Sequence, residues 1–220
     1  MKRDFIYLAS ASPRRCALLE QIGVPFRARA ADVGEARRPG ELPGAYVTRL
    51  ARAKADKIWN DMAASAARPV LAADTAVVIG RRVLGKPRDI EDALQMLADL
   101  SGRSHRVLTA VVLRHGRRVS SELSTSRVRF RPTTEHERLA YCATGEPLGK
   151  AGGYAIQGMG AIFIEHISGS YSSVMGLPVD VTAAMLQEFG FPTWLQAAER
   201  PARGRRFSSM SRRGRCARHY

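Results

Sequence analysis

Residues 10–15 (SASPRR) place two hydroxyls and two guanidiniums where a predicted strand passes into a predicted helix. Serine is a favoured N-cap and proline is favoured in the first helical turn, so we expect the helix to begin at Ser12 and Pro13. The free backbone N–H groups of a helix start attract anions, and Arg14 and Arg15 would add charge to such a cradle. An ordinary capped helix with exposed arginines is the competing interpretation. This segment alone favours neither, and it is not a P-loop.

Asp74 and Thr75 separate two apolar runs, 70–73 and 76–79. Burying a carboxylate is costly unless a cation meets it. Asp74 could therefore hold a divalent cation such as Mg²⁺, or orient and deprotonate a water molecule. The competing interpretation is an aspartate at a strand end that accepts backbone N–H bonds, and this one is favoured for a lone aspartate.

Two further segments combine glycine with a polar side chain that could face a ligand. Lys86 lies in residues 85–87 (GKP), twelve residues after Asp74, and its point charge suits a phosphate. In residues 150–158 (KAGGYAIQG), the amide of Gln157 can donate and accept, as the reading of a base edge requires. Taken separately, a surface turn is the favoured explanation of Lys86, and a solvated helix face is the alternative for Lys54.

Strands and helices alternate along the chain, which indicates an α/β fold. Asp89 and the Thr134/Glu137 pair are predicted helix caps, because each places a side-chain oxygen before a helical pattern. We expect strands at 5–9, 70–73, 76–79, 106–114, 119–130, 154–156 and 161–165, and helices after Ser12 and over 45–62, 89–100, 134–143 and 178–189.

Composition and charge limit the classes of protein to which this sequence can belong. The chain has 220 residues, 45% of them hydrophobic and 25% charged, which is typical of a globular domain and excludes a collagen or a coiled coil. Three scattered cysteines argue against a disulfide framework and a structural zinc site. No apolar run approaches the ~18 residues that a membrane span needs, and the first apolar stretch is too short for a signal peptide. We therefore expect a cytoplasmic protein with no membrane partner.

The basic charge is uneven. The net charge is +15, and eight arginines with no acidic residue lie between residues 200 and 220, which leaves +7 for the rest. We expect one domain over residues 1–192 and a disordered basic tail over 193–220. A basic body favours an anionic ligand.

Taken together and in order, these segments resemble the Maf family of nucleotide pyrophosphatases. Any one motif is weak, but the ordered set is specific and spans about residues 5–190. The matching segments are 8–15 (LASASPRR), 46–55 (YVTRLARAKA), 72–78 (AADTAVV), 84–87 (LGKP), 100–113 (LSGRSHRVLTAVVL), 150–158 (KAGGYAIQG) and 169–178 (GSYSSVMGLP).

The resemblance implies hydrolysis of a nucleoside triphosphate to the monophosphate and pyrophosphate, with a divalent metal, Mg²⁺ or Mn²⁺. It implies a two-lobed fold like that of inosine triphosphate pyrophosphatase, in which helices flank a mixed twisted sheet around a central cleft, and it also implies a homodimer. The family's general base falls on Asp74, which would also bind the metal with Glu35. Phosphate-binding positions fall on Ser12, Arg14, Arg15, Lys54 and Lys86.

The resemblance also implies a substrate. One subfamily acts on dTTP and UTP and carries an IQG-type segment, as residues 156–158 do here. Its specificity positions fall on Arg14, Thr75 and Gln157. Modified pyrimidine nucleotides, 7-methyl-GTP and a non-enzymatic role in binding nucleic acid through the basic tail are the alternatives. The body shows no nucleic-acid-binding motif, which disfavours the last. Gly149 departs from the family pattern, where an aspartate is common.

Overall fold

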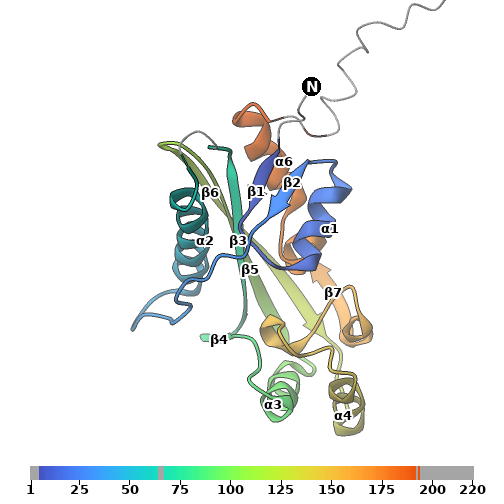
Figure 1. Cartoon of the computed structure of the whole chain (residues 1–220). Helices are drawn as coiled ribbons and strands as arrows, with labels where there is room; N and C mark the ends of the chain where they lie inside the picture. The colour runs from blue at the N-terminus through green and yellow to red at the C-terminus, as the bar shows by residue number, and fades with distance from the viewer. Residues whose placement is uncertain (1–4, 64–66, 192, 194–220) are drawn as a thin grey trace, which may run out of the picture.

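The computed structural model describes residues 5–63, 67–191 and 193. Within them, seven strands form one sheet in the order β2-β1-β3-β5-β6-β7, with β4 beside β3 (Figure 1). The strands are β1 (Ile6–Leu8), β2 (Phe26–Ala28), β3 (Val70–Ile79), β4 (Arg82–Leu84), β5 (Ser104–His115), β6 (Arg118–Phe130) and β7 (Ile164–Ser168). The predicted tail, apart from residue 193, lies outside the described residues.

Six α-helices and two 3₁₀ turns complete the described part of the chain. They are α1 (Pro13–Gln21), α2 (Pro43–Asn60), α3 (Ile90–Leu100), α4 (Glu135–Ala143), α5 (Tyr171–Met175), α6 (Val179–Glu188), η2 (Ala151–Gly153) and η3 (Met159–Phe163). No helix in the described ranges is long and apolar enough to cross a bilayer. The mixed sheet flanked by helices confirms the predicted α/β class.

The helices cover the sheet in three places (Figure 1). Helix α2 covers one face, where Val47 and Ala51 pack among Ala72 and Ala76 of β3. Helices α1 and α6 cover the opposite face of the same part of the sheet. Helices α3 and α4 pack with the other end of β5 and β6. The long strands β3, β5 and β6 therefore extend from the part of the sheet that α1, α2 and α6 cover to the part that packs with α3 and α4.

Strand β3 has an open stretch of edge between its two short neighbours. Parallel β1 pairs with Val70 and Leu71, and antiparallel β4 pairs with Val77 to Ile79. Between them, no described strand pairs with that edge, while the other edge pairs with β5 throughout. Side chains on both faces of β3 are thus accessible from one opening. The expectation of two runs with Asp74 at a strand end is wrong, because Asp74 lies in the middle of one ten-residue strand.

Local signals predicted the caps well and the glycine-rich region poorly. Asp89 accepts the Asp92 N–H at 2.8 Å, and Thr134 forms the capping box with Glu137. The predicted strand at 154–156 is wrong, because left-handed backbone at glycines 152 and 153 turns the chain just before it. The strand expected over 161–165 begins only at residue 164, after the 3₁₀ turn η3.

Candidate active site

One cleft of about 470 Å³, at the open edge of β3, collects every side chain that the sequence nominated. The start of α1, the loop before α2, α2 itself, β3, the loop after β4 and the segment before η3 all contribute to its wall. The nominated residues that line it are Ser12, Arg14, Arg15, Glu35, Lys54, Asp74, Thr75, Lys86 and Gln157. The structure therefore brings together groups separated by up to 145 residues.

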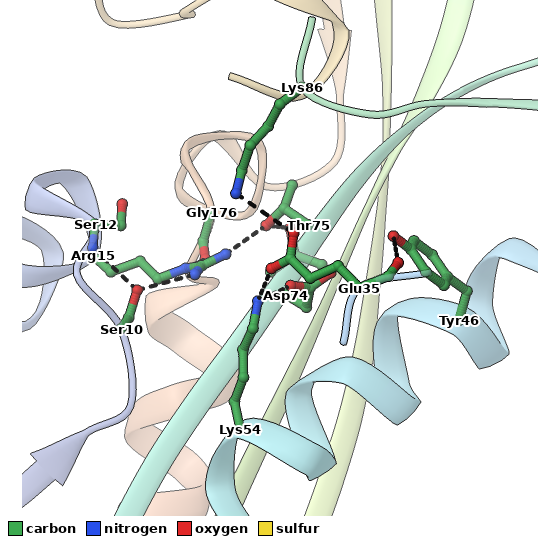
Figure 2. Close-up of polar contacts among 11 residues, drawn as sticks. Ser10, Ser12, Arg15, Glu35, Tyr46, Lys54, Asp74, Thr75, Lys86 and Gly176 are labelled. Atoms are coloured by element: carbon green, nitrogen blue, oxygen red, sulfur yellow. Dashed lines mark hydrogen bonds and ion pairs between the residues drawn. The ribbon is translucent and has the colours of Figure 1, made fainter. Parts of the chain in front are cut away.

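A buried ion pair lies at the floor of the cleft. The Lys54 Nζ is 2.6 Å from Asp74 Oδ1, and the two residues are only 9% and 8% exposed. Lys54 lies on the core-facing side of α2, in the same stripe as Leu50 and Ile58, so it is not on a solvated helix face. Figure 2 shows Lys54 reaching up from α2 to Asp74. The second oxygen of Asp74, Oδ2, has no hydrogen bond to a described residue and can accept one from water.

A second carboxylate shares the same ammonium group. Glu35 Oε1 accepts a hydrogen bond from Lys54 Nζ at 2.9 Å, and Glu35 Oε2 lies 3.6 Å from Lys86 Nζ. Tyr46 holds this loop from α2 by donating its hydroxyl to the Glu35 carbonyl at 2.9 Å. Glu35 thus bridges Lys54 and Lys86 (Figure 2).

Burial and neighbouring charges shift the pKa values of Asp74, Lys54 and Glu35 in opposite directions. Burial raises the pKa of Asp74, although the charge of Lys54 and its hydrogen bond oppose the shift. Burial alone lowers the pKa of Lys54, but the charge and hydrogen bond of Asp74 outweigh it, with help from Glu35, and the pKa lies above its ordinary value. The pKa of Glu35 is lowered, because Lys54 and Lys86 outweigh its burial. Burial thus makes Asp74 more basic than an ordinary aspartate, whereas the two lysines make Glu35 less basic than an ordinary glutamate.

Arg15 cross-links three parts of the cleft wall. Its guanidinium donates to the Gly176 carbonyl at 2.8 Å, to Ser10 Oγ at 3.1 Å and to Thr75 Oγ1 at 3.2 Å. Burial lowers the pKa of Arg15, and the charge of Asp74 opposes the shift. Arg15 holds the start of α1 against β3 and the end of α5, so it contributes a fixed positive charge at the cleft floor.

The hydroxyl of Thr75 belongs to a directed chain. Thr109 Oγ1 donates to the Ser173 carbonyl at 2.8 Å, so its proton is committed. The 3.0 Å contact between Thr75 and Thr109 therefore has Thr75 as donor. Thr75 also accepts from Arg15, which leaves one acceptor lone pair to offer a ligand. Thr75 can therefore affect substrate specificity in two ways: it can accept a hydrogen bond from the substrate, or it can help to position Arg15.

Arg14, Lys150 and Gln157 also line the cleft. Burial lowers the pKa of Arg14, and the charge of Glu146 opposes it. Burial and the charge of Arg14 lower the pKa of Lys150, against Glu146. These cations thus share one acidic neighbour at the edge of the cleft.

Several residues of the site were missed by sequence reasoning. Lys150 stands inside a quoted motif, so its place there could have nominated it, whereas the Ser10 hydroxyl already belongs to the cradle predicted for residues 10–15. Thr109 and Tyr46 also lie inside quoted segments, 100–113 and 46–55, but nothing in those segments indicates which atoms they contact. Thr109 meets Thr75 only because β3 and β5 pair in that register, and Tyr46 acts on a backbone carbonyl eleven residues away.

The donor set at the floor fits a divalent cation that also binds the ligand. No group of three or more His, Cys, Asp or Glu gathers within the described residues. Asp74 and Glu35, however, converge on one point, where Lys54 contacts both. Magnesium is commonly bound by one or two carboxylates together with substrate phosphates, so these two oxygen donors suffice if a polyphosphate supplies others.

Comparisons with known proteins identify a family for this chain. A family model described as Maf-like protein matches residues 5–189. Proteins named dTTP/UTP pyrophosphatase are similar to this chain: that of Chromobacterium violaceum is 48% identical over 84% of this chain and 95% of its own, and that of Cupriavidus metallidurans is 50% identical over 85% and 98%. The solved Staphylococcus aureus Ham1 protein covers 84% of this chain and all of its own, at 12% identity and a TM-score of 0.42.

Proposed function

The chain belongs to the Maf-like protein family, and we propose that it is a nucleotide pyrophosphatase that hydrolyses dTTP and UTP. The relatives of about 48–50% identity carry that activity in their names, and they match this chain over nearly their whole length. The products would be the nucleoside monophosphate and pyrophosphate. The single observation that carries the proposal is a buried, cation-paired Asp74 in the cleft that also holds the arginines of α1 and Lys86.

Asp74 is the proposed general base. Lys54 fixes its Oδ1, so Oδ2 is left facing the cleft to accept a proton from water. Because burial raises the pKa of Asp74, its carboxylate is a stronger base than an exposed one. Attack of that water on the α-phosphorus would break the bond to the β-phosphate. Pyrophosphate leaves, and the proton resides on Asp74 until solvent takes it.

The cationic side chains of the cleft would offset the negative charge of the substrate. A nucleoside triphosphate carries close to four negative charges, which repel a nucleophile and grow at the leaving oxygen in the transition state. Arg14, Arg15, Lys54 and Lys86 all line the same cleft. Hydrogen bonds hold Arg15 and Lys54 in place before the substrate binds, which is how electrostatic stabilisation acts. The Ser12 hydroxyl lies at the same helix start and can donate to a phosphate oxygen.

A divalent cation, Mg²⁺ or Mn²⁺, is proposed as the cofactor. Asp74 and Glu35 would hold it together with phosphate oxygens. Bound there, it would supply Lewis-acid stabilisation of the phosphate charge. In this proposal Lys54 keeps the two carboxylates close together when no cation is present, since it contacts both.

Base selection is proposed for the part of the cleft wall that carries Gln157. The Gln157 amide can meet the oxo and imide groups of uracil or thymine, which present one acceptor and one donor side by side. Arg14 lines the same region, and Thr75 offers one acceptor from the floor. We expect dTTP and UTP to be preferred to 7-methyl-GTP, whose larger ring carries a different edge.

The test is a panel of nucleoside triphosphates with Mg²⁺ or Mn²⁺, in which released pyrophosphate is measured. We expect dTTP and UTP to give the largest kcat/KM. In H₂¹⁸O the label should enter the monophosphate, because water attacks the α-phosphorus. Label in pyrophosphate would refute that site of attack, and a preference for 7-methyl-GTP would overturn the proposed substrate.

Deleting residues 200–220 separates an enzyme from a nucleic-acid binder. The deletion removes eight arginines and no residue of the cleft. A pyrophosphatase should keep its turnover, whereas a binder acting through the tail should lose a salt-sensitive affinity for nucleic acid. Cytoplasmic location and a homodimer remain predictions, which fractionation and light scattering would check.

A further inference from the structure

The segment that carries Gln157 is held on both sides by two side chains from the region of α4. The Ala155 N–H donates to Tyr141 Oη at 3.2 Å. The Met159 and Gly160 N–H groups donate to the two carboxylate oxygens of Glu146 at 3.0 and 3.1 Å. Gln157 therefore lies midway between two anchored points of the backbone.

Tyr141 and Glu146 form a single unit. The Tyr141 hydroxyl donates to Glu146 Oε1 at 2.8 Å, so one oxygen both accepts from Ala155 and orients the carboxylate. Tyr141 is 5% exposed and packs edge-on against Phe163. Burial raises the pKa of Tyr141, with the hydrogen bond to Glu146 adding to the shift, so the hydroxyl keeps its proton and the unit stays intact at neutral pH.

Close approach at two glycines shows how tightly this unit grips the segment. A Cβ at Gly158 would collide with the carboxylate of Glu146, and a Cβ at Gly160 would lie 2.7 Å from Tyr141 Oη. Contacts under 3.0 Å require atoms to move, so the segment reaches this position only because both residues are glycine. The hydrogen bonds depend on this approach.

The Gln157 side chain itself has no partner among the described residues, although it lines the cleft. Its place is therefore decided by its backbone. A carboxamide can present donor and acceptor in either order, so the direction from which it approaches the base affects whether uracil or cytosine is bound. A fixed backbone on both sides sets that direction.

We infer that Tyr141 and Glu146 are positioning residues for base selection: they hold the segment 155–160 so that the Gln157 amide meets a uracil or thymine edge. This inference rests on the proposed function. Neither residue lines the cleft, so neither touches the substrate. Their effect is expected on the KM of uracil and thymine nucleotides and not on the bond-breaking step.

The experiment compares Tyr141→Phe, Glu146→Gln and the double variant with the wild-type enzyme. The kcat and KM for UTP and CTP are measured, together with hydrogen–deuterium exchange of the amides at 155, 159 and 160 in the absence of nucleotide. Glu137→Gln is the matched control. Like Glu146→Gln, it removes a carboxylate that accepts a backbone N–H, here that of Thr134, and it also removes an ion pair with Arg131, but Glu137 lies outside the cleft and the segment.

We expect each single variant to lower the ratio of kcat/KM for UTP over CTP by about tenfold, the scale of one misplaced bidentate contact to a base. The loss should fall on the KM for UTP, with kcat changed less than threefold, and the three amides should exchange faster. The double variant should resemble the singles, because the two residues act as one unit. Glu137→Gln should change neither the ratio nor these amides.

Failure of the inference and failure of the proposed function give different results. If the wild type hydrolyses UTP but both variants keep its UTP/CTP ratio, the positioning role is overturned. A fall in the ratio that Glu137→Gln reproduces is a general effect of destabilising α4 and overturns it as well. If the wild type hydrolyses neither nucleotide, the proposed function fails, and the inference about base selection fails with it.

Discussion

Replacing Lys54 by methionine should expose the cost of the buried carboxylate beside it. Methionine preserves most of the side-chain volume and removes only the ammonium group that contacts Asp74 and Glu35. Asp74 is 8% exposed and would lose its nearest cation, whereas the Glu35 side chain is 46% exposed and can be solvated. The destabilisation should therefore come almost entirely from Asp74.

The magnitude follows from the burial of both partners. Removing one member of a buried ion pair costs about 3–5 kcal/mol, because the other is left charged without compensation. Asp74 can escape part of this cost by binding a proton. Its pKa is already raised by burial, and loss of Lys54 removes the main opposing influence. The free energy of unfolding of Lys54→Met should then fall with rising pH, by up to about 1.4 kcal/mol per pH unit.

The sign follows from proton binding. An aspartate whose pKa is higher in the folded state binds more protons there than in the unfolded chain. Stability is therefore lost as pH rises from the unfolded-state pKa through the folded-state pKa, and it is regained on acidification. The wild type has the same sign, but its window is narrower because Lys54 opposes the rise in the pKa of Asp74.

Urea unfolding followed by circular dichroism at several pH values between 5 and 8 measures the effect. Lys57→Met is the matched control, since Lys57 lies on the same helix and pairs with Asp61 at 2.7 Å on the surface. An exposed pair of this kind contributes about 0.5 kcal/mol or less. At pH 8 we expect Lys54→Met to lose about 3 kcal/mol, and Lys54→Met with Asp74→Asn to recover most of it. A loss under about 1 kcal/mol that does not vary with pH would refute the reasoning.

Three further outcomes are expected from the same site. Asp74→Asn should lower kcat by roughly 10²–10⁴-fold, the usual contribution of a general base. Its circular dichroism spectrum should be unchanged, because Lys54 still pairs with Glu35. Activity within a few-fold of wild type would disprove the role of Asp74 as the base. The wild-type kcat/KM, measured as a function of pH, should fall on acidification as Asp74 is protonated, with a midpoint above the ordinary aspartate range. In the same measurement, Lys54→Met should move that midpoint to higher pH. Thr109→Val should cost about 1–3 kcal/mol in urea unfolding and raise the KM for UTP, since it removes the acceptor for Thr75; unchanged stability would contradict the directed chain.

Local signals in the sequence predicted those features whose partners lie nearby along the chain. Asp89 caps α3 through the N–H three residues on, and Thr134 and Glu137 satisfy each other over the same distance. The paired strands β5 and β6 follow from two long β-type runs around a short turn. The membership of the site also came from the sequence, because the ordered motifs nominated nine residues that line one cleft.

The sequence did not predict elements that depend on distant neighbours. Strands β2 and β4 have three residues each and form only because β1 and β3 lie beside them. The segment 154–156 has the composition of a strand, but two left-handed glycines before it and the anchors on Tyr141 and Glu146 after them prevent strand pairing.

By itself, then, the sequence determined the α/β class, the caps and the list of polar side chains that would meet. Only the tertiary structure decided where Asp74 stands: in the middle of a strand, at the stretch of edge that β1 and β4 leave unpaired, above a lysine on the buried side of α2. The physical reason is the distance along the chain between the interacting residues. A cap is satisfied within one helical turn, whereas the burial and charge of Asp74 depend on strands and helices that the chain brings together only when it folds.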